Sequence, residues 1–257
     1  MPVSLVVGGH GKVASHLTRI LTSETQPPHT VHSIIRAAEQ AADVEKLGAY
    51  PIVQSVEEAT VPELLTTLSR IKPDLVVWAA GAPFGSGDRI DKVDREGAIK
   101  VMDALAIAAQ AGDTGKRFVS ISALDLRDRE NRPVPDWYDE QDKSRSDRLW
   151  AAIGPHLVAK LAADRELRTG NDKRGLDYTI VRPGGLNNDP GQKAVAAGKV
   201  HLGRTIARED VARVVAECLK NDNTIGLAFD AVGGDDPVAE AVKDVGAQKI
   251  DTFEGYY

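Results

Sequence analysis

A glycine-rich turn near the start of the chain has the spacing of a dinucleotide-binding turn. Gly8, Gly9 and Gly11 follow an apolar run and precede a segment of helical periodicity. Gly8, Gly11 and Ala14 fit G-x-x-G-x-x-[GA], and Gly9, Gly11 and Ala14 also fit G-x-G-x-x-[GA]. Glycine permits a tight turn and a close approach to a diphosphate, whose charge would face the free N–H groups of the next helix. The residues expected to bind the cofactor here are Gly8, Gly9, His10, Gly11, Lys12 and Val13.

The end of the second expected strand bears on which dinucleotide would bind. An NAD site usually carries Asp or Glu there, which binds the ribose hydroxyls. This chain reads HSIIRA over 32–37 and has no acid in that stretch. Arg36 could pair with the 2′-phosphate of NADP, because its guanidinium is planar and always charged; the alternative is a solvated surface arginine. The sequence therefore favours NADP (NADPH) over NAD.

Short apolar runs that resemble strands alternate with longer helical windows along the whole chain. The expected strands are 3–7, 30–35, 52–53, 74–80, 117–122, 177–181 and 225–229. The expected helices are 11–21, 37–47, 61–71, 88–111, 149–167, 207–219 and 237–245. Such alternation packs as a mostly parallel sheet with right-handed crossovers. We expect an α/β, Rossmann-type, doubly wound sheet of about seven strands with helices on both faces.

One NAD(P)-binding domain is expected over 1–257, with two segments that interrupt the alternation. Residues 125–148 are rich in Asp, Arg and Pro and have no clear period, which predicts a polar loop or insertion. Residues 187–205 are predicted to form a small cap above the sheet. Such caps commonly shape a substrate pocket near the carboxyl ends of the strands.

Composition excludes several classes of protein. The 32 Lys+Arg and 38 Asp+Glu give a net charge of −6, without the basic block that nucleic-acid binding needs. One cysteine, Cys218, excludes a disulfide framework and a Cys-based zinc site, and His29, His32 and His201 lack metal-ligand spacing. No run approaches the roughly 18 apolar residues of a membrane span, and the start does not resemble a signal peptide. We expect a cytoplasmic protein that binds a small-molecule substrate but no metal, nucleic acid or membrane; a homodimer stays open.

Together these motifs resemble an atypical short-chain dehydrogenase/reductase of the single-domain NAD(P)-binding branch. The resemblance covers nearly the whole chain. It is carried by the segments GGHGKV at 8–13, IR at 35–36, VVWAAGA at 76–82, VSISA at 119–123, AKLAAD at 159–164, LDYTIVRPGGL at 176–186 and IAREDVA at 206–212. Their order and spacing together are more specific than any one of them.

The resemblance implies roles for residues beyond the glycine turn. Lys160 would hold the nicotinamide ribose, and Ser122 matches the active-site serine of the family. Residues that would line the adenosine side are Ala79, Ala80 and Gly81. Residues that would border the nicotinamide are Pro183, Gly184 and Leu186. The family often has an Asp that reaches the adenine, but here 54–55 reads Gln-Ser, so that contact departs from the pattern.

The active centre departs further from the family pattern, which is Tyr-x-x-x-Lys. Here the window is His156-Leu157-Val158-Ala159-Lys160, and none of the five tyrosines has a lysine four residues later. Spacing of i, i+4 puts His156 and Lys160 on one helical face. Histidine can act as a general acid or base near neutral pH. Either His156 serves in catalysis with Ser122 and Lys160, or the position is inert.

Two functions of different classes follow from these observations. The first is an NADP-dependent oxidoreductase that transfers hydride to a small carbonyl or alkene substrate, with Ser122 and His156 at the substrate oxygen. The second is a non-catalytic NAD(P)-binding redox sensor or regulatory protein that has lost the active-site tyrosine. A third option, an epimerase or dehydratase, would normally require a larger sugar-nucleotide domain than this chain can form.

Overall fold

A nine-stranded sheet runs through the computed structural model, which describes residues 1–257. The strands are β1 (Val3–Val7), β2 (Thr30–Ile35), β3 (Tyr50–Val53), β4 (Leu75–Trp78), β5 (Arg117–Ile121), β6 (Asp177–Pro183), β7 (Gly185–Asn187), β8 (Ala194–Gly198), β9 (Thr205–Ala207), β10 (Ala228–Gly233) and β11 (Asp236–Pro237). The helices are α1 (Lys12–Ser23), α2 (Ala41–Glu45), α3 (Val61–Ile71), α4 (Ala98–Gln110), α5 (Glu140–Arg174), α6 (Arg208–Lys220) and α7 (Val238–Gln248). Shorter elements are η1 (Ala38–Gln40), the π-helix η2 (Asp91–Gly97) and η3 (Asp222–Thr224).

The strand order in the main sheet is β11-β8-β10-β6-β5-β4-β1-β2-β3. All neighbours from β10 to β3 are parallel, whereas β8 is antiparallel to both β10 and β11. The predicted Rossmann-type parallel sheet is therefore confirmed, with two more strands than the expected seven. Both additional strands lie at one edge. β7 and β9 pair separately as a two-stranded parallel sheet.

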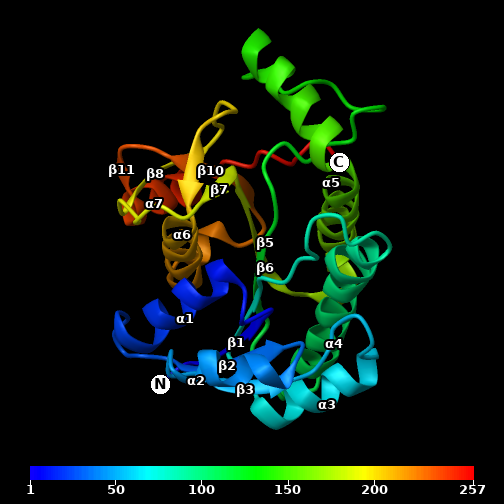
Figure 1. Ribbon diagram of the computed structural model, residues 1–257, viewed down its shortest axis with the longest axis vertical. Helices are drawn as coiled ribbons and strands as arrows, with labels where there is room; N and C mark the ends of the chain where they lie inside the picture. Colours follow the sequence, from blue (N-terminus) through cyan, green and yellow to red (C-terminus); the bar gives the residue numbers. More distant parts are fainter.

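Helices cover both faces of the sheet, as Figure 1 shows: α1, α6 and α7 on one side and α3, α4 and α5 on the other. The strands supply apolar side chains to both layers because successive residues point to opposite faces. In β1, Val6 belongs to the core cluster under α1 and α6, while Leu5 and Val7 belong to the cluster under α3, α4 and α5. This two-sided burial explains why the strand reads as a continuous apolar run.

The structure differs from the expected elements over 125–205. α5 begins at Glu140, not at 149, because Asp139 caps it: the Asp139 side chain accepts from Asp142 N–H, and Asp142 reaches back to Asp139 N–H. Only the first part of the predicted polar insertion is therefore a loop. The helix is kinked at Ile153, just before Pro155. Within the expected cap at 187–205, β8 joins the main sheet.

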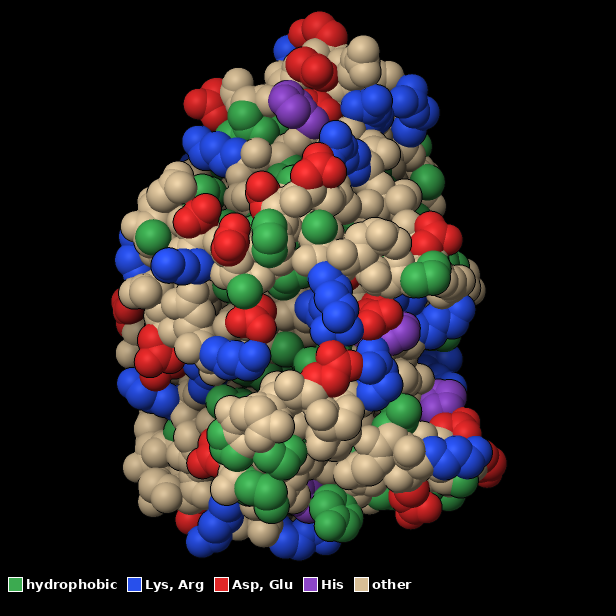
Figure 2. Space-filling view, turned by 90° about the vertical axis from the view of Figure 1, so that its left-hand side faces the viewer, with side chains coloured by type: hydrophobic (Ala, Val, Ile, Leu, Met, Phe, Trp, Pro, Cys, Tyr) green, Lys and Arg blue, Asp and Glu red, His purple; other side chains and the backbone are tan.

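Two further features concern the surface and the helices. Figure 2 shows the face over α1, α6 and α7, where Lys and Arg side chains are interspersed with Asp and Glu rather than gathered in one area. The expected helix 88–111 starts instead as the π-helix η2 and continues as α4. No helix combines the length and the apolar character needed to cross a bilayer.

A buried arginine ties β5 to β6 and α6. Arg117, at the start of β5, is 7% exposed. Its Nη1 donates to the Asp177 carbonyl at 2.8 Å, and its Nη2 donates to the Cys218 carbonyl at 2.7 Å. The hydroxyls of Thr179 and Thr224 lie 2.9 and 3.1 Å from the same Nη2. The Thr179 and Thr224 hydroxyls also hydrogen-bond to each other at 3.0 Å, so the guanidinium is part of a largely buried polar network.

We expect Arg117→Ala to lower the free energy of unfolding by about 3 kcal/mol, since it removes several hydrogen bonds that a buried, charged donor makes. The matched control is Lys116→Ala next to it. Lys116 forms an exposed ion pair with Asp177 at 3.1 Å, and its loss should cost less than about 1 kcal/mol. Urea titration of both variants measures the difference. If both lose the same free energy of unfolding, the buried hydrogen bonds of Arg117 do not stabilise the fold as proposed.

Candidate cofactor and active site

A cavity lies at the carboxyl ends of the parallel strands, around the point where β1 and β4 meet. There the strand order reverses, which is where open α/β sheets bind ligands. The cavity holds about 230 Å³. Its walls come from the turn after β1, the ends of β2 and β3, the stretch after β4 and the loop before η2. The lining residues that the sequence predicted for the cofactor are Gly8, His10, Gly11, Arg36, Ala79, Ala80 and Gly81.

The glycine turn has the geometry that a diphosphate requires. Gly8 has φ +83°, and a Cβ there would lie 2.6 Å from the Cα of Ala80. The N–H groups of Gly8 and Gly9 both donate to the carbonyl of Ile34, which fixes the turn against β2. Gly11 is the N-cap of α1 and offers no side-chain cap, and the first turn holds no acid. The free N–H groups at this helix start can therefore bind an anion.

The ribose end of the cavity contains Arg36 and His10. The Arg36 side chain is 53% exposed, and its Nη1 lies 4.0 Å from Oε1 of Glu57. The ring of His10 lies 3.3 Å from both Gln40 Nε2 and Asp43 Oδ2, which links the glycine turn to η1 and α2. Gln40 Oε1 in turn accepts from the Arg36 N–H at 3.1 Å. The backbone that carries Arg36 is therefore held in place while its guanidinium stays accessible.

Gln54 stands at the adenine end, where the family pattern has an acid. Its Oε1 is buried without a hydrogen-bond partner, and the residue lines the cavity. A buried acceptor without a donor is costly unless a ligand supplies one. The exocyclic amine of an adenine is a suitable donor. With the glycine turn, this unpaired oxygen shows that the residues present fit an adenine dinucleotide.

Lys160 is held by an acid that the sequence interpretation missed. Its Nζ lies 2.8 Å from Oδ1 of Asp94, which is 1% exposed and belongs to the π-helix η2. The other oxygen, Oδ2, accepts from the N–H of Ala82 at 2.8 Å. A Cβ on Gly81 would lie 3.3 Å from Asp94 Oδ1 and 3.8 Å from Lys160 Nζ, so this pair borders the cavity. The sequence offered no specific signal for Asp94, because Asp88, Asp91 and Glu96 lie near it in the same segment.

Ser122 pairs with a second buried acid, Asp164, which the sequence interpretation also missed. Ser122 Oγ donates to Oδ2 of Asp164 at 2.5 Å, and both side chains are buried. Asp164 lies one helical turn beyond Lys160 on α5. Burial raises the pKa of Asp164 to about 6, against the lowering effects of the Ser122 hydrogen bond and of Arg182 and Lys160. This carboxyl can therefore gain or lose a proton near neutral pH.

His156 lies one turn before Lys160, as the spacing predicts, but it does not line the cavity. Its ring packs edge-on against Phe84, with centroids 5.2 Å apart, and its Nε2 is buried without a partner. Phe84 itself is 80% exposed and follows Pro83 of the cavity wall. His156 is therefore next to the site and is joined to the cavity wall through the exposed Phe84.

The residues expected to border the nicotinamide lie at the end of β6 and in β7. Pro183 is buried, and Leu186 is 39% exposed. A Cβ on Gly184 would lie 2.9 Å from a methyl of Val232 and 3.0 Å from the Arg204 carbonyl. The need for glycine at 184 is thus explained by packing against β10. None of these three lines the described cavity, so their contact with a nicotinamide stays a prediction.

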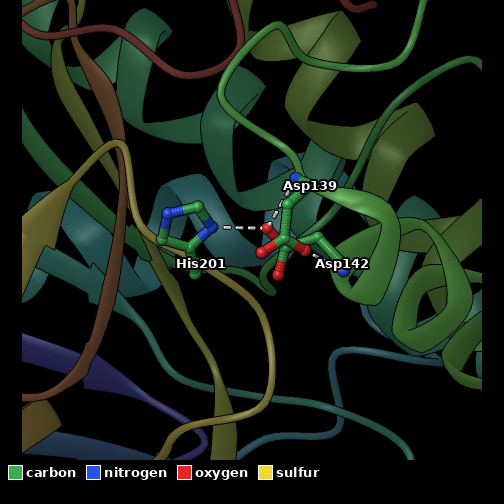
Figure 3. A group of neighbouring side chains, drawn as sticks. All are labelled: Asp139, Asp142 and His201. Carbon is green, nitrogen blue, oxygen red and sulfur yellow. Dashed lines mark hydrogen bonds and ion pairs between the residues drawn. The ribbon is translucent and has the colours of Figure 1, made fainter.

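Asp139, Asp142 and His201 form the one acidic group with metal-like spacing, shown in Figure 3. The Asp142 oxygens already accept from Asp139 N–H at 3.1 Å and Leu202 N–H at 2.7 Å, and His201 Nδ1 lies 2.5 Å away. The hydrogen bond to Asp142 raises the pKa of His201. The group is explained as a helix cap that joins α5 to the 199–204 loop.

Comparison with known proteins agrees with this geometry. Residues 8–222 match a protein family described as NAD(P)H-binding. The UPF0659 protein C216.03 of Schizosaccharomyces pombe is 38% identical over 244 residues, 94% of each chain. YhfK of Bacillus subtilis, called an uncharacterized sugar epimerase, is 34% identical over 239 residues, 93% of this chain and 97% of its own.

A solved structure from Bacillus halodurans, whose name places it among NAD-dependent epimerases/dehydratases, has the same fold. It is 31% identical with a TM-score of 0.73, covering 95% of this chain and all of that one. The matched residues 8–222 span the glycine turn, Ser122 and Lys160. The chain therefore belongs to the NAD(P)H-binding family, as a Rossmann-fold protein of the atypical short-chain dehydrogenase/reductase type.

Proposed function

We propose that this protein is an NADP-dependent reductase of a small carbonyl or alkene substrate. The observation that carries the proposal is a set of two pairs: Lys160 with the buried Asp94, next to Gly81 of the cavity wall, and Ser122 with the buried Asp164, one helical turn beyond Lys160. One pair suits a ribose contact and the other suits proton transfer. Arg36 supports the choice of NADP, because it lines the cavity at the end of β2 where an NAD site carries an acid.

The chain's own residues divide the work. The nicotinamide, when bound, supplies the hydride. The N–H groups at the start of α1 bind the diphosphate. Lys160 donates to the ribose, and Asp94 keeps its ammonium directed there. When Asp164 is protonated, its carboxyl gives a proton to Ser122 Oγ as Ser122 passes its own proton to the substrate oxygen, which leaves Asp164 as a carboxylate. A serine with an acid behind it thus replaces the missing tyrosine.

Two relatives are named as epimerases, which suggests a second candidate function. In an epimerase the cofactor is oxidised and reduced within one turnover. The same cavity and the same Lys160 would serve it. The residues 187–205 offer little chain for a sugar-nucleotide domain, because β8 is already part of the main sheet. The reductase consumes NADPH in proportion to product and the epimerase consumes none, so the stoichiometry of the cofactor separates the two.

The cofactor preference is tested by titrating the protein with NADPH, NADP⁺, NADH and NAD⁺. Arg36→Ala should weaken the two phosphorylated forms by about 1–3 kcal/mol, the range for a charged hydrogen bond, and leave the others unchanged. Arg19→Ala on α1, which pairs with Glu24 and Glu209, is the control. Equal weakening of NADH and NADPH would refute the role of Arg36.

The catalytic roles are tested by NADPH consumption over a panel of small carbonyls and activated alkenes. Ser122→Ala and Lys160→Ala should each lower turnover by about 100-fold or more, the size of general acid–base and positioning effects. His156→Ala decides whether that position acts in catalysis. Val158→Ala, exposed on the same helix, is the control. Turnover that survives all three variants removes this site, and NADPH binding without any turnover favours the sensor.

The proton on Asp164 is tested through stability. Because burial raises its pKa to about 6, above the value near 3.9 of an unfolded chain, the folded state binds this proton more tightly. The stabilisation that this bound proton gives to the folded state is present below about pH 4 and is lost as the pH rises through about 6. The free energy of unfolding of the wild type relative to Asp164→Asn should therefore fall by about 2 kcal/mol from pH 4 to pH 7.

Urea unfolding at several pH values measures this difference. The control is Asp172→Asn, an exposed position on the same helix, for which the difference should stay constant. If the free energies of unfolding of the wild type and of Asp164→Asn change in parallel between pH 4 and pH 7, Asp164 does not bind a proton in the way proposed.

A further inference from the structure

Two arginines in the cavity wall share one carboxylate. Arg89 Nε donates to Oε2 of Glu57 at 2.9 Å, and Arg89 Nη2 donates to Oε1 at 2.5 Å, which is a bidentate pair. Arg36 Nη1 lies 4.0 Å from the same Oε1. All three residues line the cavity that contains Gly8 and Gly11. A single acid is thus enclosed by two guanidinium groups at the ribose end of the dinucleotide site.

The cluster has an excess of positive charge. The hydrogen bond from Arg89 lowers the pKa of Glu57, and the charges of Arg89, Arg36 and Lys92 lower it further, against the effect of burial. Glu57 is therefore an anion at neutral pH. Its side chain is only 16% exposed, whereas those of Arg36 and Arg89 are 53% and 38% exposed. The guanidinium groups can thus accept a second anion from the cavity side.

Carboxylate and phosphate have similar geometry toward arginine, since both accept two parallel N–H bonds from its planar fork. We propose that Glu57 is the internal counter-anion of a 2′-phosphate subsite, and that Arg36 and Arg89 transfer from its carboxylate to the 2′-phosphate of an NADP-type nucleotide. Arg89 is then a second phosphate-binding residue. Glu57 limits phosphate affinity through repulsion. This inference rests on the proposed NADP preference and extends it to two further residues.

The competing role for Glu57 is an acceptor for the ribose hydroxyls, which would replace the acid that β2 lacks. The two roles give opposite signs for the same substitution. As a counter-anion, Glu57 opposes the binding of a 2′-phosphate and is indifferent to an unphosphorylated ribose. As a ribose acceptor, it strengthens the binding of an unphosphorylated nucleotide. Glu57→Gln keeps the shape and removes the charge, so it discriminates between them.

The experiment is isothermal titration of the full chain with adenosine 2′,5′-bisphosphate and with AMP, which need neither substrate nor nicotinamide. Glu57→Gln should tighten the bisphosphate by about threefold to tenfold, because a repulsive charge is removed, and leave AMP unchanged. Arg89→Ala should weaken the bisphosphate by about tenfold with no change for AMP, as expected for a charged hydrogen bond. Arg89→Lys, which keeps the charge without the fork, should lie between wild type and Arg89→Ala.

The matched controls are Asp91→Asn and Arg95→Ala, which break an Asp–Arg pair of 2.7 Å on η2 that does not line the cavity. Neither should change the ratio of the two affinities. The inference is overturned if Glu57→Gln weakens AMP, or if Arg89→Ala leaves the ratio unchanged. If Arg36→Ala alone lowers the ratio, the NADP preference stands and this extension of it fails. If the wild type binds the bisphosphate no better than AMP, the NADP preference fails with it.

Discussion

The contact between the turn after β1 and the stretch after β4 governs the rest of this structure. A Cβ at Gly8 would lie 2.6 Å from the Cα of Ala80, so the two backbone segments are in close contact and leave no room for a side chain at Gly8. In this turn the Ile34 carbonyl accepts hydrogen bonds from the N–H groups of both Gly8 and Gly9, and α1 then starts at the cavity. After β1 the chain crosses over one face of the sheet, and after β4 it crosses over the other face. The gap between these two connections is where the cavity lies. The turn and the cavity are one feature.

Two buried acids, Asp94 and Asp164, are each matched to a donor, and this explains how the fold accommodates them. Asp94 receives Lys160 and the Ala82 N–H, and Asp164 receives the Ser122 hydroxyl. An unpaired buried charge would cost several kcal/mol, so these partners are required for folding as well as for chemistry. Asp164 has the Ser122 hydroxyl as its hydrogen-bond partner, and burial raises its pKa to about 6.

Local patterns predicted the parallel sheet, the glycine turn and the position of Arg36, because each depends on residues close together in the chain. The apolar strands and the helix after Gly11 are of this kind. The start of α5 at Glu140 was missed because its first turns are polar and exposed, so no apolar period marks them. Asp94 and Asp164 were missed for another reason: their partners lie 66 and 42 residues away, and only the folded sheet brings them together.

A shared cofactor site does not determine which reaction an enzyme catalyses. The diphosphate turn and the lysine serve any enzyme that moves a hydride to or from a nicotinamide, so they are equally compatible with the reductase and the epimerase. What separates these reactions is where the accompanying proton comes from and where it goes. In this chain the tyrosine position is His156, which packs against Phe84 outside the cavity, whereas Ser122 contacts an acid that titrates near neutral pH. The proposed reduction needs one proton for each hydride delivered, and in that proposal the Asp164 carboxyl is its source.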